Sequence, residues 1–158
     1  MTGRREPQAR KRRQAEAAGT SDTIGAVTMA SLDSSVEVLQ RLAHRQPGLR
    51  LLLLFGSRVR GDATARSDWD LGYLAEPDFD AAEFLAQVVE ILGTDRVDLV
   101  DLAHAGGQLR FRAAQDGRVV YAADSKVYAR FWLDTVSFWC DAGPVLRAGY
   151  AHVLASLG

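Results

Sequence analysis

The sequence predicts one layered domain of the α/β or α+β class. Short apolar or alternating segments that suit strands occur between segments whose apolar residues recur at helical spacing. The chain has 158 residues, of which 47% are hydrophobic, which is enough for one compact core and too little for two comfortable ones. No internal repeat or low-complexity linker follows residue 30. We therefore treat the chain after that point as one folded region with a C-terminal tail.

Residues 1–30 are polar, charged and small, and basic residues crowd their first part: Arg4, Arg5, Arg10, Lys11, Arg12 and Arg13. This composition indicates a disordered basic leader. The alternative is a nucleic-acid-binding arm, which the absence of aromatic residues for base stacking disfavours. The net charge of -1 leaves the rest mildly acidic, which does not favour binding to a polyanion.

The composition also bounds the location and the metal chemistry of the protein. No stretch approaches the roughly 20 apolar residues that span a bilayer, and no secretory signal follows the basic start. The single cysteine and the scattered histidines leave no cluster for zinc. We therefore expect a cytoplasmic protein without a membrane partner.

The folded region is expected to begin with a helix and a buried strand. Ser31 or Asp33 can cap a helix that ends at Pro47-Gly48. Residues 51–55 are wholly apolar and are closed by glycine, which suits a strand buried on both faces. Residues 56–67 are polar and punctuated by glycine, and we expect one short helix and a loop there.

Strands and helices then alternate. The further expected strands are residues 69–74, 96–102 and 118–121. A helix opened by Asp78 or Asp80 and stopped by Gly93 separates the first two. A helix through Leu109 and Phe111 separates the second from the third, which an Asp116-Gly117 turn introduces.

Residues 125–157 read as a helical tail that is interrupted at Gly143-Pro144. Aromatic residues lie on two faces of this tail, at Tyr128, Phe131, Trp132, Phe138 and Trp139. Core packing accounts for some of them, but a small domain buries only one such face. We therefore expect residues 124–158 to form an extension that packs on the domain or on a partner chain.

The residues with the clearest chemistry begin where the first buried strand ends. Gly56 allows a phosphate to approach the backbone, Ser57 supplies a hydroxyl, and the first N–H groups of a helix are unpaired donors. A lone Gly-Ser pair is weak evidence, because most such pairs are only turns. Arg58 and Arg60 are candidates to bind phosphate oxygens; the alternative is that they face solvent or pair with Asp62.

Asp68 and Asp70 are two positions apart at the edge of the next strand, so their side chains share a face. Neighbouring carboxylates repel one another, and a divalent cation removes the conflict. Mg²⁺ is usually held by one or two carboxylates together with substrate phosphates, and two ions can align the reacting oxygens. Asp-x-Asp alone is more often a helix cap or a solvated strand edge.

The third strand offers a further carboxylate. Asp98 and Asp101 are three apart, so strand parity puts them on opposite faces and at most one can join the site. Asp98 stands between the apolar Val97 and Leu99, and we select it as a metal ligand and general base. Asp101 is expected to be a solvated strand-end residue.

The spacing of Gly56-Ser57, ten residues and Asp68-Trp69-Asp70 resembles the signature of the DNA polymerase β nucleotidyltransferase superfamily. The loop from Arg58 to Ser67 and the strand 96–102 are similar to those of its minimal nucleotidyltransferases, the MNT proteins. The resemblance covers roughly residues 33–157 and departs at Trp69, where an aliphatic residue is commoner. It implies an α+β fold in which residues 31–123 form the nucleotidyltransferase domain, with a mixed sheet and helices mainly on one face.

The resemblance also implies a reaction, the transfer of a nucleoside monophosphate from ATP or another NTP to a hydroxyl. The residues it assigns to the nucleotide are Gly56, Ser57, Arg58 and Ser67, and those it assigns to two Mg²⁺ ions and catalysis are Asp68, Asp70 and Asp98. Small bacterial MNT proteins look like antitoxins that attach AMP to a tyrosine of a HEPN ribonuclease toxin. The alternatives are an antitoxin that acts by binding alone and a nucleotidyltransferase acting on a small molecule such as an aminoglycoside.

Overall fold

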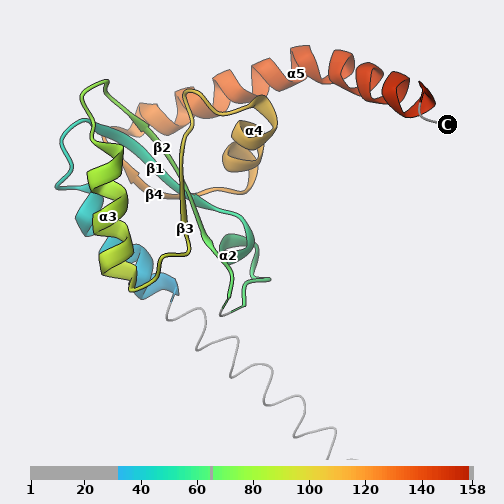
Figure 1. Ribbon diagram of the computed structural model, residues 1–158. Coiled ribbons are helices and arrows are strands. Elements are labelled where there is room, and N and C mark those ends of the chain that lie inside the picture. The colour runs from blue at the N-terminus through green and yellow to red at the C-terminus, as the bar shows by residue number, and fades with distance from the viewer. Residues whose placement is uncertain (1–31, 65, 157–158) are drawn as a thin grey trace, which may run out of the picture. The chain divides into compact units, whose positions relative to one another are not determined.

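The computed structural model describes residues 32–64 and 66–156, and their side chains up to residue 141 (Figure 1). The chain divides into two compact units, Met1–Val36 and Glu37–Gly158. The expected basic leader, residues 1–30, lies outside the described residues. Every described strand belongs to the second unit.

Four strands form one mixed sheet, and they are β1 (Leu49–Phe55), β2 (Trp69–Ala75), β3 (Val97–Asp101) and β4 (Arg118–Ala122). Their order in the sheet is β3-β2-β1-β4. β1 is antiparallel to both of its neighbours, whereas β2 and β3 are parallel. A parallel pair needs a crossover connection, and the helix between β2 and β3 provides it. The α+β class and the mixed sheet are therefore confirmed.

The helices occupy residues 32–43, α2 (Ser57–Arg60), α3 (Ala81–Leu92), α4 (Gly107–Asp116) and α5 (Ser125–Ser156). The expected ends of α3 are confirmed, since the Asp80 side chain accepts hydrogen bonds from two N–H groups of its first turn and Gly93 adopts the left-handed conformation with φ 64°. The expected interruption of the tail at Gly143-Pro144 is wrong. A proline withdraws only one donor from the helical ladder, and the 32-residue α5 retains the others.

β1 lies at the centre of the hydrophobic core. Its residues 51–54 are fully buried and Phe55 is 6% exposed, which confirms the prediction of a strand covered on both faces. Leu51, Leu53 and Phe55 pack with Ala113 and Ala114 of α4 and with Phe131 of α5. The alternate side chains, Leu52 and Leu54, face the other way, and Figure 1 shows α3 on that side.

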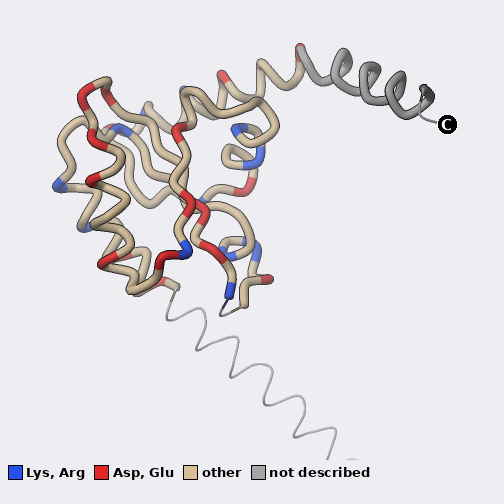
Figure 2. Tube along the Cα trace, viewed as in Figure 1, with Lys and Arg blue, Asp and Glu red and all other residues tan. Residues whose placement is uncertain are grey.

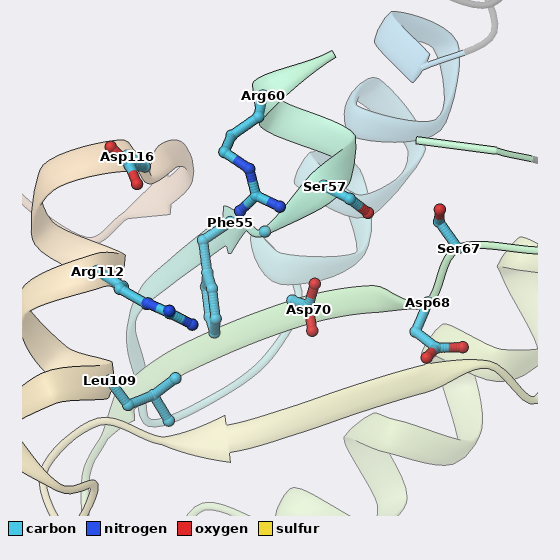
Figure 3. A pocket seen from close by; sticks show the side chains of 10 residues that line it. Phe55, Ser57, Arg60, Ser67, Asp68, Asp70, Leu109, Arg112 and Asp116 are labelled. Atoms are coloured by element: carbon cyan, nitrogen blue, oxygen red, sulfur yellow. The ribbon is translucent and has the colours of Figure 1, made fainter. Parts of the chain in front are cut away.

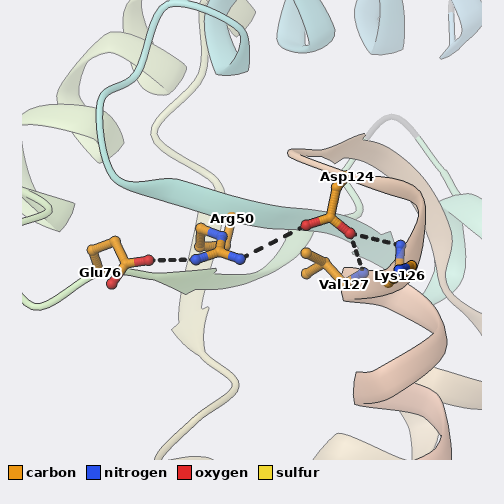
Figure 4. A network of polar contacts seen from close by, with 5 residues as sticks. All are labelled: Arg50, Glu76, Asp124, Lys126 and Val127. Carbon is orange, nitrogen blue, oxygen red and sulfur yellow. Dashed lines mark hydrogen bonds and ion pairs between the residues drawn. The ribbon is translucent and has the colours of Figure 1, made fainter.

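A polar network joins the first part of β1 to β2 and to the start of α5 (Figure 4). The Arg50 guanidinium lies 2.5 Å from a carboxylate oxygen of Glu76 and 3.8 Å from one of Asp124. Asp124 also accepts hydrogen bonds from the backbone N–H groups of Lys126 and Val127, so it caps α5. The network therefore fixes where α5 begins.

The other end of β1 positions the polar loop. Phe55, its last residue, is paired in register with Asp70 of β2. The chain leaves the sheet at Gly56 and returns at Trp69, so the loop between them emerges beside the acidic start of β2. In the described part of the chain, no helix has both the length and the apolar character needed to cross a membrane.

Candidate active site

Gly56 makes a tight turn directly against Asp70. Its backbone has φ 78° and ψ -155°, and no side chain caps the start of α2 that follows. A Cβ atom at Gly56 would lie 1.9 Å from Oδ2 of Asp70, a distance that no side chain tolerates. Only glycine satisfies both the positive φ and this close approach. The turn and the carboxylate are therefore parts of one site.

A cavity of about 390 Å³ opens at this turn (Figure 3). One wall comes from the β1–α2–β2 region, namely Phe55, Gly56, Ser57, Arg60, Ser67, Asp68 and Asp70. The opposite wall comes from α4, namely Leu109, Arg112 and Asp116. Cavities of this volume are typical of small-molecule sites. Of the residues that the sequence assigned to the nucleotide, Gly56, Ser57 and Ser67 line the cavity, whereas Arg58 does not.

The third acidic residue lies on the strand beside the cavity. Asp98 is paired in register with Asp70 across the parallel β2–β3 ladder, and Asp101 is paired with Tyr73. Residues paired in this way point to the same face, so Asp98 and Asp70 share a face that Asp101 does not. Figure 2 shows acidic positions of the two strands side by side. Asp98 itself does not line the cavity.

The carboxylates influence one another electrostatically. Burial raises the pKa of Asp70, and the negative charges of Asp98 and Asp68 raise this pKa further. The positive charges of Arg60 and Arg58 act in the opposite direction. Negative charge therefore gathers at Asp70 despite the two arginines.

This donor set fits a cation that binds together with an anionic substrate. Within residues 32–64 and 66–156, no three side chains of His, Cys, Asp or Glu are grouped so as to hold a metal ion on their own. Asp68 and Asp98 are exposed and Asp70 is half-buried. Mg²⁺ usually takes one or two carboxylates and completes its shell with substrate phosphates and water. A closed metal cage made only of protein does not fit these residues.

Arg58 supports the loop and does not line the cavity. Its Nε donates a hydrogen bond to the carbonyl oxygen of Asp68 at 3.1 Å, and its Nη2 donates one to that of Ser67 at 2.5 Å. Its guanidinium lies 4.2 Å from the ring centroid of Trp69, a cation–π contact. Burial lowers the pKa of Arg58, an effect opposed by Asp68 and Asp70. The bulky Trp69 therefore serves as the platform for this arginine.

Ser67 has a structural contact as well as a place in the cavity wall. Its hydroxyl oxygen accepts a hydrogen bond from the backbone N–H of Thr64 at 2.9 Å. This bond closes a turn just before the acidic pair. Arg96 reinforces the same loop by donating to the carbonyl oxygen of Arg66 at 2.6 Å.

Arg58 and Arg60 are expected to respond differently to substitution. We expect Arg58→Ala to lower the free energy of unfolding by about 1–2 kcal/mol, because it loses two hydrogen bonds and the contact with Trp69. We expect Arg60→Ala to change it by less than about 0.5 kcal/mol, because its one ion pair, with Asp62, is exposed and 3.4 Å long. Urea denaturation measures both. The reverse order of the two effects would show that Arg58 does not hold the loop.

Sequence reasoning missed the α4 wall. The helix itself was predicted, and Leu109, Arg112 and Asp116 are spaced by three and four positions, so they share one face. What the sequence could not supply is the rotation of the helix, which the burial of Ala113 and Ala114 against β1 sets. Phe55 was predicted as a core residue, and its position at the cavity follows from its place at the end of β1.

Comparisons with known proteins agree with this geometry. The family model described as polymerase beta, nucleotidyltransferase matches residues 37–126. The protein adenylyltransferase MntA of Aphanizomenon flos-aquae (strain 2012/KM1/D3) is 30% identical over 108 residues, which cover 60% of this chain and 71% of that protein.

Solved structures give similar matches. A chain in a crystal structure described as a toxin-antitoxin with AMP-PNP has 25% identity and a TM-score of 0.64, over 76% of this chain and 98% of that one. A chain from a structure of tri-AMPylated Shewanella oneidensis HEPN toxin in complex with MNT antitoxin has 23% identity and a TM-score of 0.62, over 78% and 98%. At 23% identity the second match is a likeness of fold.

Proposed function

Because this chain belongs to the polymerase beta nucleotidyltransferase family, we propose that it transfers AMP from ATP to a hydroxyl group of a partner protein. The acceptor in this proposal is a tyrosine of a HEPN toxin, so that the chain acts as an antitoxin. The observation that carries the proposal is the in-register pairing of Asp70 with Asp98 on the face where Asp70 meets the Gly56 turn. That arrangement gathers carboxylates beside a place where a phosphate can approach the backbone.

The choice of a protein acceptor rests on the relatives. The curated relative is named a protein adenylyltransferase, and the solved structure with AMP-PNP is a toxin-antitoxin complex. ATP is accordingly the proposed donor. The proposed reaction needs ATP, which is abundant in the cytoplasm, so the cytoplasm remains the proposed location.

In the proposed reaction the residues of this chain hold the nucleotide and receive a proton. The Ser57 hydroxyl and the backbone N–H groups at the start of α2 donate hydrogen bonds to phosphate oxygens, and Arg60 adds positive charge from the same wall of the cavity. Asp68, Asp70 and Asp98 are the proposed ligands of two Mg²⁺ ions. When bound, these ions would neutralise phosphate charge and help to align the reacting groups.

The bonds change as follows in this proposal. The acceptor oxygen attacks the α-phosphorus of ATP and forms a new P–O bond, while the bond between the α-phosphorus and the bridging oxygen breaks and pyrophosphate leaves. The acceptor proton passes to a carboxylate oxygen of Asp98. Asp98 is exposed and shares a face with Asp70, so it is accessible to a hydroxyl carried by a large partner.

The test is transfer of label from ATP to the partner. We expect the full chain, incubated with Mg²⁺, ATP labelled in the α-phosphate and a HEPN toxin from the same genome, to label that protein. Asp68→Ala is expected to reduce the label by at least about a hundredfold, because it removes a charge from the metal-binding set. Gel autoradiography and intact-mass measurement, which shows a gain of one or more AMP units, provide the readouts.

Two other results would point away from this function. Tight complex formation without label would indicate an antitoxin that acts by binding alone. Label on an aminoglycoside, with none on the HEPN protein, would indicate a small-molecule enzyme. A substitution on the other face of β3, Asp101→Asn, serves as the matched control and is expected to leave the label unchanged, since Asp101 is paired with Tyr73 rather than with Asp70.

A further inference from the structure

The wall of the cavity that α4 contributes carries two charged side chains without protein partners. Arg112 and Asp116 stand four positions apart on α4 and both line the cavity. That spacing permits an ion pair on a helix. Within the described residues, neither the Arg112 guanidinium nor the Asp116 carboxylate takes part in an ion pair or hydrogen bond. Both groups are therefore available to a molecule in the cavity.

Arg112 differs in this respect from several other arginines of the domain. Arg58 binds two backbone carbonyl oxygens, Arg96 binds one, and Arg50 joins two carboxylates. Figure 3 shows the guanidinium of Arg112 extending from α4 toward the ring of Phe55. A guanidinium is a flat group with N–H donors along its edges. Arg112 is exposed and lines the cavity, so its donors are available to a molecule bound there.

The remaining residues of this region are apolar. Phe55 contributes an aromatic ring from the end of β1, and Leu109 lies one turn before Arg112 on α4. This wall therefore combines apolar surface, one unpaired donor group and one unpaired acceptor group. A flat heterocycle whose edge carries donors and acceptors is complementary to such a surface, since aromatic and guanidinium groups stack on bases and the polar groups read their edges. A phosphate is not, because the carboxylate of Asp116 would repel it.

The opposite wall supplies what the rest of a nucleotide needs. Gly56, Ser57 and Arg60, proposed above to bind phosphates, and Asp68 and Asp70, proposed to bind the accompanying cations, all line the cavity. The α4 wall would therefore contact the base, and the opposite wall would contact the phosphates. This division rests on the nucleotide-binding function proposed above and extends it to the identity of the base.

We propose that Arg112 and Asp116 of α4, with Phe55 and Leu109, form the subsite for the nucleobase and select bases that carry an exocyclic amino group. The Asp116 carboxylate accepts a hydrogen bond from that amino group, and Arg112 donates to an adjacent ring acceptor. Adenine and cytosine present an amino group beside a ring nitrogen acceptor. Uracil presents a carbonyl oxygen at the same place, which faces the Asp116 carboxylate without a proton between them. The subsite therefore favours ATP over UTP.

The experiment is an equilibrium titration of the full chain with non-hydrolysable analogues of ATP and UTP in the presence of Mg²⁺. We expect the unaltered chain to bind the ATP analogue at least about tenfold more tightly, since a carboxylate left without a hydrogen-bond donor is costly when desolvated. Asp116→Asn supplies an N–H donor in place of a pure acceptor, so we expect the preference to fall to about threefold or less. Gln115→Ala, an exposed change beside Asp116 that does not line the cavity, is expected to preserve it.

Arg112→Gln separates base recognition from phosphate binding. We expect it to weaken the ATP analogue and AMP by a similar factor, about tenfold, because the base is common to both. Weaker binding of the ATP analogue with unchanged AMP binding would assign Arg112 to the β- and γ-phosphates and overturn its role in base recognition.

The outcomes also separate this inference from the proposed function. If the unaltered chain binds both analogues equally, or if Asp116→Asn leaves a preference for ATP intact, the base subsite is refuted while nucleotide binding stands. If the unaltered chain binds neither analogue, both the subsite and the proposed function are refuted. Circular dichroism and thermal unfolding of each variant check that its helix content and stability are unchanged.

Discussion

Asp70→Asn is expected to abolish nucleotidyl transfer while leaving the fold at least as stable. The loss should be at least about a hundredfold in rate, because the substitution removes a charge from the centre of the acidic cluster. Stability should not fall, because burial and the charges of Asp98 and Asp68 raise the pKa of Asp70. A raised pKa means that at neutral pH the ionised carboxylate is less favourable in the folded chain than in the unfolded one. The neutral amide removes that penalty.

The measurement pairs a labelling assay with thermal unfolding in EDTA. Asp98→Asn is expected to behave as Asp70→Asn does in the labelling assay, whereas Asp101→Asn should retain activity. Asp101 accepts a hydrogen bond from the N–H of Ala103 and pairs with His104. The side-chain oxygen of an asparagine can still accept the hydrogen bond from Ala103. A stable Asp70→Asn variant that retains full activity would refute the assignment of the acidic cluster to catalysis.

Gly56→Ala is expected to have the second large effect. The substitution meets two obstacles, a backbone φ of 78° that L residues avoid and a Cβ atom 1.9 Å from Oδ2 of Asp70. The first costs on the order of 1–3 kcal/mol, because φ 78° with ψ -155° is a backbone conformation adopted essentially only by glycine. The second cannot be relieved without moving the Asp70 carboxylate or the turn, so we expect nucleotide binding and transfer to fall by at least about tenfold. Denaturation and nucleotide titration separate the two consequences.

Gly61→Ala is the matched control for this change. Gly61 also has a positive φ, 83°, but nothing lies within 4 Å of the Cβ that it would gain. Gly61 has ψ 9° and lies in the left-handed region, where an L residue costs about 1–2 kcal/mol. We therefore expect Gly61→Ala to show this backbone cost and to retain most of the nucleotide affinity. Equal losses of affinity in the two variants would mean that the turn is sensitive to backbone strain alone, and that its contact with Asp70 has no role.

Local patterns were sufficient to predict the strands and the acidic positions. The run from Leu51 to Phe55 was apolar without a break, and it became the strand that is buried on both faces. Parity alone placed Asp98 and Asp101 on opposite faces of the third strand, and the parallel register with β2 then brought Asp98 beside Asp70. These features depend on residues that are near one another in the sequence, or on a strand period that admits only two faces.

Long-range packing decided the features that the sequence did not reveal. The position of the Arg58 side chain follows from the carbonyl oxygens of Ser67 and Asp68, and these meet it only after the loop has folded back on α2. The α4 wall of the cavity depends on the rotation of that helix against β1. Pro144 shows the same limit for local signals, since α5 continues through a residue that usually ends a helix.

The network around Arg50 has a practical consequence for engineering. It lies at one end of β1 and the Gly56 turn lies at the other, with four fully buried leucines between them. The buried strand thus separates two polar regions. One end holds the start of α5 through Arg50 and Asp124, and the other end leads into the turn beside Asp70. Substituting Arg50 or Asp124 would weaken the contacts that hold the start of α5. Such a change could alter the position of α5 without altering the residues around Asp70.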